Sequence, residues 1–173
     1  MEAVVDTGVL VEYINESSPH HPKVRKLLEG NNSLYITPVT MSEVMYVGYR
    51  VYKAAGLSNA NELARELFLW ASLKLKVTDV NKDVALQAGE IKKKYGIALP
   101  DCYVIATANH LGVKALFKRE KELIAVIDKS VSNNFTHLIV IGYTRSRRPL
   151  STLTRSVHWR SRGSARPFQR SGA

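Results

Sequence analysis

Short apolar runs alternate with longer amphipathic segments over residues 1–142 of the chain. The apolar runs are rich in Val, Leu and Ile, and they predict β-strands at residues 3–5, 34–36, 75–78, 113–117 and 137–141. Between them, apolar residues recur three and four positions apart, which predicts helices at about residues 9–14, 22–29, 41–55, 59–73, 82–94, 101–109 and 120–130. The chain therefore alternates between strand and helix.

Polar residues and glycines mark the expected ends of these helices. Thr40 or Ser42 is expected to cap the helix that ends at Gly56, and Asp79 or Asn81 the helix after the third strand. In that later helix four apolar residues are expected to be buried, namely Val84, Leu86, Ala88 and Ile91.

Strands separated by helices of this length pair in parallel, because the chain must cross back over the sheet between them. We therefore expect an α/β fold for residues 1–142, a three-layer α/β/α domain with a central, mostly parallel five-stranded sheet. No apolar run approaches the ~18 residues that span a bilayer, and the first residues lack the pattern of a secretory signal, so we expect a cytoplasmic protein without a membrane segment. The single cysteine, Cys102, excludes an internal disulfide framework and a zinc site of several thiolates.

The formal charge of +10 is concentrated in the C-terminal tail, residues 143–173. Residues 1–142 hold 17 Lys and Arg against all 15 Asp and Glu, whereas the tail holds 8 Arg and no acid. The tail is rich in Ser, Arg, Gly and Pro and has no sustained apolar period, so we expect it to be disordered. Its composition fits an RNA-binding arm, but a solvated extension, even one foreign to the domain, is the favoured explanation because compositional signals of this kind are weak.

Four acids fall where the predicted sheet presents the carboxyl ends of its strands. Asp6 ends the first strand, Glu43 starts the helix after the second, Asp101 opens the helix before the fourth, and Glu120 follows the fourth. Singly, each also has an ordinary explanation as a helix cap, a first-turn acid or a partner of nearby Lys and Arg. Together they lie on the edge where open parallel sheets bind ligands, which favours a common site.

Carboxylates packed together repel one another and are pushed towards protonation unless a divalent cation lies among them. Oxygen ligands without a second thiol or an imidazole suit Mg²⁺, with Mn²⁺ as a substitute, better than zinc. The acids therefore predict a Mg²⁺ site at this edge of the sheet.

Three short motifs surround these acids. Residues 4–10 read Val-Val-Asp-Thr-Gly-Val-Leu, residues 40–44 read Thr-Met-Ser-Glu-Val, and residues 99–108 read Leu-Pro-Asp-Cys-Tyr-Val-Ile-Ala-Thr-Ala. In order and spacing they resemble the opening, the Ser-Glu element and the Asp-containing helix start of the PIN-domain family. Within that family the chain is similar to the VapC-like single-domain ribonucleases that are the toxins of type II toxin–antitoxin pairs, and the resemblance covers residues 1 to about 142.

The fourth motif departs from the family pattern. Members commonly show Thr-x-Asp after the fourth strand, whereas residues 117–120 read Phe-Lys-Arg-Glu, with an apolar residue at the Thr position and a longer acid shifted by one. Glu120 is the best candidate for the fourth acid, with Glu122 behind it. A longer, displaced carboxylate of this kind is expected to reach the metal only through water.

The resemblance and the chemistry of phosphodiester hydrolysis together imply a Mg²⁺-dependent endoribonuclease. Asp6 and Asp101 are expected to bind Mg²⁺ directly or through water, Glu43 to complete the site and help deprotonate the attacking water, and Glu120 to hold a second or weaker metal. Two hydroxyls next to these ligands are expected to orient them, and four cations near the acids are candidate RNA contacts, although surface charge explains those cations as well. These residues are Thr7 and Ser42 for the hydroxyls, and Arg50, Lys53, Lys118 and Arg119 for the cations.

The two helices at about residues 41–55 and 59–73 carry more apolar and aromatic surface than one sheet face needs, including Tyr46, Tyr49 and Tyr52. In the resembling family this region supports a homodimer and receives the small antitoxin protein, so we expect both partners here.

Two other functions stay open. A catalytically weak or inactive PIN-like module that binds RNA or protein is favoured by the irregular fourth motif, whereas a phosphatase-like hydrolase lacks its Asp-x-Asp opening.

Overall fold

The structure is a computed structural model that describes residues 1–118 and 138–141. Within it five strands form one sheet, in the order β3-β2-β1-β4-β5, and each neighbouring pair is parallel. The strands are β1 (Glu2–Val5), β2 (Ser33–Ile36), β3 (Lys76–Val77), β4 (Lys114–Lys118) and β5 (Leu138–Ile141). The helices are α1 (Thr7–Ile14), α2 (His21–Glu29), α3 (Pro38–Ala54), α4 (Ala60–Lys74), α5 (Lys82–Tyr95) and α6 (Leu99–Leu111). The predicted helix at 120–130, and the tail at 143–173 with its expected disorder, lie outside the described residues.

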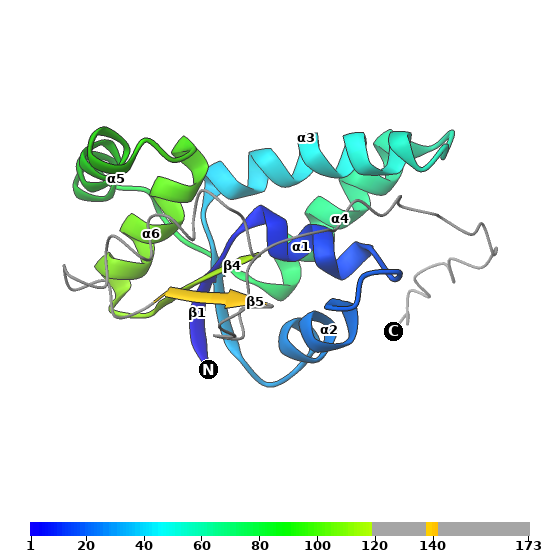
Figure 1. Cartoon of the computed structure of the whole chain (residues 1–173), viewed down its shortest axis with the longest axis horizontal. Coiled ribbons are helices and arrows are strands. Elements are labelled where there is room, and N and C mark those ends of the chain that lie inside the picture. The colour runs from blue at the N-terminus through cyan, green and yellow to red at the C-terminus, as the bar shows by residue number, and fades with distance from the viewer. Residues whose placement is uncertain (119–137, 142–173) are drawn as a thin grey trace, which may run out of the picture.

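Two apolar cores lie on opposite faces of the sheet. In β1, Ala3 and Val5 pack into the core formed with α1, α2, α3 and α4, whereas Val4 packs into the core formed with α5 and α6. Successive side chains of a strand point to opposite faces, so an apolar run of this kind requires helices on both sides. Figure 1 shows α5 and α6 on one side and α1 and α2 on the other. The predicted three-layer α/β/α fold is confirmed.

Two local predictions are wrong. The cap of α3 is Thr37, whose hydroxyl oxygen accepts a hydrogen bond from the Thr40 backbone N–H at 3.0 Å, because Pro38 suits the first helical turn and starts the helix directly after β2. Leu86 is 69% exposed, since it lies two positions from Val84 and faces away from the buried stripe of α5. Asn81 does cap α5, as one of the two expected candidates, and the other three apolar residues of that stripe are buried.

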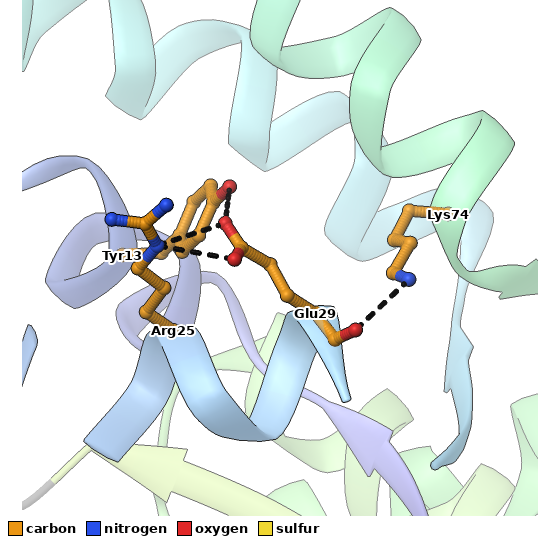
Figure 2. A network of polar contacts seen from close by, with 4 residues as sticks. All are labelled: Tyr13, Arg25, Glu29 and Lys74. Carbon is orange, nitrogen blue, oxygen red and sulfur yellow. Dashed lines mark hydrogen bonds and ion pairs between the residues drawn. The ribbon is translucent and has the colours of Figure 1, made fainter. Parts of the chain in front are cut away.

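A polar and aromatic cluster fastens α1 to α2 and α4 (Figure 2). The Tyr13 hydroxyl donates to Glu29 at 3.0 Å, and Arg25 holds the same carboxylate from one turn away on α2. The Tyr13 ring stacks on Trp70 of α4 with 4.5 Å between ring centroids, and Lys74 reaches the Glu29 backbone carbonyl. Burial, and then the hydrogen bond to Glu29, raises the pKa of Tyr13 to about 12, so its hydroxyl stays a donor over the physiological range. The cluster fixes the C-terminal end of α1, the helix whose N-terminal end is capped by Asp6.

No helix among residues 1–118 is both long and apolar enough to cross a membrane.

Candidate active site

Asp6 lies between β1 and α1 and serves as the N-cap of that helix. Its Oδ2 accepts a hydrogen bond from the Gly8 backbone N–H at 2.8 Å, and its own backbone N–H donates to the Leu116 carbonyl of β4 at 3.0 Å. The side chain is only 6% exposed. Asp6 is therefore a helix cap, which is the ordinary explanation for an acid at this position. A cap does not require burial, and its burial makes this carboxylate unusual.

The ionised form of Asp6 is strongly disfavoured. Burial, and then the negative charges of Asp101 and Glu43, raise the pKa of Asp6 from 3.8 to about 8 against the opposing backbone hydrogen bond from Gly8. Both charges act on Asp6 although they are far from it in sequence. The carboxyl ends of the strands thus bring three of the four predicted acids into electrostatic contact.

Glu43 is held by Thr7. The Thr7 hydroxyl donates to Glu43 Oε2 at 2.7 Å and so links the first turn of α1 to the second turn of α3. Thr7 is buried, which shields this hydrogen bond from water. The sequence singles out Thr7 for its position next to Asp6, and in the structure its hydroxyl holds Glu43 instead.

Asp101 lies in the first turn of α6, directly after Pro100 at the start of that helix. It is partly buried. The neighbouring Cys102 faces the core, where its Sγ donates to the Ala98 carbonyl at 3.2 Å. Burial, and then the charge of Asp101, raises the pKa of Cys102 to about 11, so the thiol stays protonated and belongs to the core.

The other predicted site residues are less closely joined to these acids. Ser42 is exposed, and its hydroxyl donates to the Val39 carbonyl of its own helix at 2.7 Å. Arg50 and Lys53 are exposed on α3, about 10 and 15 Å along the helix axis from Glu43, and each lies over a tyrosine ring of the same helix. The remaining three candidates, Arg119, Glu120 and Glu122, lie outside the described residues.

Lys118 does not extend freely into solvent. Its Nζ lies 2.7 Å from Oε1 of Glu12 on α1, and the Ser18 hydroxyl donates to the other oxygen of that carboxylate. Burial alone would raise the pKa of Glu12, but the hydrogen bonds from Lys118 and Ser18 outweigh it and hold the pKa below its ordinary value. Our sequence reasoning missed Glu12. The available signal is that it is the single acid in the otherwise apolar helix at residues 7–14.

The acids at this edge of the sheet suit a hard divalent cation, because their donor atoms are oxygens. Too few of the described acids lie close together to hold such an ion. Within residues 1–118 and 138–141, no three acid, histidine or cysteine side chains are grouped closely enough to hold a metal ion by themselves. The charge of Asp101 nevertheless disfavours ionisation of the buried Asp6, and a Mg²⁺ or Mn²⁺ ion would relieve this repulsion. The sequence predicts Glu43 to complete the site and Glu120, which lies outside the described residues, to hold a second or weaker metal.

Comparisons with known proteins agree with this fold. The chain is 26% identical over 128 residues to the ribonuclease VapC6 of Methanocaldococcus jannaschii, an alignment that covers 65% of this chain and 84% of the relative. Among solved structures, a toxin–antitoxin complex from Klebsiella pneumoniae matches with a TM-score of 0.54 and 19% identity, covering 79% of this chain and 95% of the other. VapBC2 from Rickettsia felis, bound to a DNA fragment from its promoter, matches with a TM-score of 0.56 and 17% identity over 81% and 97% of the two chains. The family model of the PIN domain matches residues 3–129, and the chain therefore belongs to the PIN domain family.

Proposed function

We propose that this protein is a Mg²⁺-dependent endoribonuclease and the toxin of a type II toxin–antitoxin pair. The observation that carries the proposal is the buried Asp6, whose pKa is raised by its burial and by the nearby charges of Asp101 and Glu43. A fold gains nothing in stability from such a cluster, so the arrangement is best explained by a ligand with positive charge. A relative named as a ribonuclease supports RNA as the substrate.

In this mechanism each of the candidate site residues named below has its own role. Asp6 and Asp101 would hold the cation, and Mn²⁺ would substitute for Mg²⁺. When bound, the cation neutralises charge on the phosphate and lowers the pKa of water. Glu43, which the Thr7 hydroxyl holds, would accept a proton from the attacking water. Arg50 and Lys53 are proposed to contact phosphates of the RNA further along α3.

The test is cleavage of end-labelled single-stranded RNA by the full chain in Mg²⁺, in Mn²⁺ and in excess EDTA. Cleavage in either metal and its loss in EDTA are expected. RNA binding without cleavage would instead support the inactive module, which the irregular sequence at residues 117–120 favours.

Replacing Thr7 by Val should impair catalysis without unfolding the protein. Val has nearly the same shape but cannot donate, so Glu43 loses the hydroxyl that orients it. Loss of such an orienting partner lowers activity or metal affinity about 10–100-fold. Steady-state cleavage as a function of Mg²⁺ concentration measures both quantities. Thr7→Ser keeps the donor and should stay within a few-fold of the parent, and a Thr7→Val variant as active as the parent would contradict the role of this hydroxyl.

We also propose that α3 and α4 form the surface for a second copy of the chain and for an antitoxin. Tyr46 on α3, and Leu69 and Leu73 on α4, are exposed, Leu73 to 84%. A large apolar surface of this kind is typical of an interface. The solved toxin–antitoxin structures that share this fold support an antitoxin as the partner.

The dimer has a direct measurement. Analytical ultracentrifugation at micromolar concentration should give twice the chain mass of 19.3 kDa. Leu73→Glu should shift the protein towards the monomer, because it buries a charge in the interface. Leu86→Glu on the exposed face of α5 is the matched control and should remain dimeric. A monomeric parent would overturn the dimer.

A further inference from the structure

An ion pair with a buried carboxylate lies directly beside the Asp6 turn. Glu12 is 4% exposed, and both of its carboxylate oxygens are occupied, one by the Lys118 ammonium and one by the Ser18 hydroxyl. Lys118 is more open, since 37% of its side chain is exposed. Through these contacts Glu12 connects α1 with Ser18, in the segment after that helix, and with Lys118, the last residue of β4.

The path of the Lys118 side chain brings this pair to the candidate active site. In the parallel register Val5 lies opposite Leu116, so β4 continues two residues beyond the end of β1 and runs beside the first turn of α1. Gly8 in that turn leaves room for it. A Cβ at Gly8 would lie 3.0 Å from Asp6 Oδ2 and 3.0 Å from Lys118 Cβ. The aliphatic part of Lys118 therefore packs against the turn whose backbone N–H holds the Asp6 carboxylate.

The Glu12–Lys118 pair is better explained as a contact that fixes the positions of two elements than as a source of stability. Desolvation of a buried ion pair largely cancels its attraction, and apolar residues of equal size would often be at least as stable. The pair does fix the position of β4 relative to α1, because Lys118 must reach the carboxylate of Glu12, one helical turn after Gly8. The same contact commits the ammonium to Glu12 and so does not favour Lys118 as a phosphate contact.

We propose that Glu12 and Lys118 are positioning residues for the carboxylate site, an inference that rests on the proposed nuclease function. They fix the end of β4 against the turn whose Gly8 backbone N–H holds the Asp6 carboxylate, and so fix the position of that carboxylate. Neither residue touches the substrate in this role.

The test compares Lys118→Met, Glu12→Gln and the double variant with the parent. Each single variant should lower kcat for RNA cleavage about 10–100-fold at saturating Mg²⁺, with KM for RNA unchanged within about twofold. The double variant should be no worse than the more impaired single variant, because both substitutions break one contact. Lys118→Arg keeps the charge and should retain kcat within a few-fold. Lys114→Met, at the exposed opposite end of β4, is the matched control and should change nothing.

A phosphate-binding role for Lys118 gives a different result and would overturn the proposal. In that case Lys118→Met raises KM, whereas Glu12→Gln lowers it by releasing the ammonium. A loss of thermal stability with normal kcat would reduce the pair to a structural contact and overturn the proposal as well. If circular dichroism shows Lys118→Met to be unfolded, Ser18→Ala removes only the hydroxyl that holds Glu12, and it should lower kcat severalfold with KM unchanged.

Direct binding of Mn²⁺, followed by electron paramagnetic resonance, separates this proposal from the nuclease function. If the parent binds Mn²⁺ but cleaves no RNA, the nuclease function fails, and positioning still predicts about tenfold weaker Mn²⁺ binding in Lys118→Met and Glu12→Gln than in Lys114→Met. Equal affinities in all of these variants would overturn the positioning role. A parent that binds no Mn²⁺ would overturn both.

Discussion

Asp6→Asn is expected to abolish Mg²⁺-dependent cleavage of RNA while the fold stays intact. Asn is as good an N-cap as Asp and can accept the same hydrogen bond from the Gly8 backbone N–H, so α1 should begin at the same residue. What the variant removes is the negative charge that would bind the cation. A fall in kcat of at least about a thousandfold is expected, equivalent to ~4 kcal/mol of transition-state stabilisation.

Gel-based cleavage of labelled RNA and far-ultraviolet circular dichroism measure the two halves of this expectation. The matched control is Asp83→Asn, which removes an exposed aspartate from the first turn of α5, away from the three coupled acids. It should cleave at the parental rate. An Asp6→Asn variant that cleaves as fast as the parent would refute the assignment of Asp6, whatever its spectrum.

The convergence of Asp6, Glu43 and Asp101 could be predicted because it follows from topology. Each acid lies next to the end of a strand or at the start of a crossover helix, and a parallel sheet brings those points to one side regardless of their distance along the chain. Apolar periodicity was sufficient to identify the strands. The electrostatic effect of Asp101 and Glu43 on Asp6 is the structural counterpart of that argument.

The partner that each side chain selects could not be predicted in the same way. Sequence proximity to Glu120 makes Lys118 a candidate phosphate contact, yet its ammonium binds Glu12, which is distant in sequence. Similarly, Ser42 is adjacent to Glu43 in the chain, but its hydroxyl bonds to its own helix, and Thr7 from another element holds Glu43. These choices depend on register and packing, which a periodic pattern does not specify.

The stability of the metal-free protein should fall with rising pH because of Asp6. Its pKa is raised from 3.8 to about 8 in the folded state, first by burial and then by Asp101. Between these two values the folded state retains a proton that the unfolded state has released, so the free energy of unfolding decreases by ~1.4 kcal/mol per pH unit from this group. The stabilising effect is complete below about pH 4 and is lost as the pH rises through about 8. Asn at position 6 cannot ionise and removes this dependence.

Urea unfolding of the parent and Asp6→Asn in EDTA at pH 5, 7 and 9 isolates the effect, because all other titrating groups are common to both proteins. The free energy of unfolding of the variant should increase relative to that of the parent as the pH rises. By pH 9 the variant should be the more stable by several kcal/mol. At pH 9, Mg²⁺ should restore stability to the parent and leave the variant unchanged, since only an ionised Asp6 attracts the cation. Identical pH dependence in the two proteins would mean that Asp6 ionises without cost in the fold. The burial and repulsion at this edge would then give no reason for a cation to bind there.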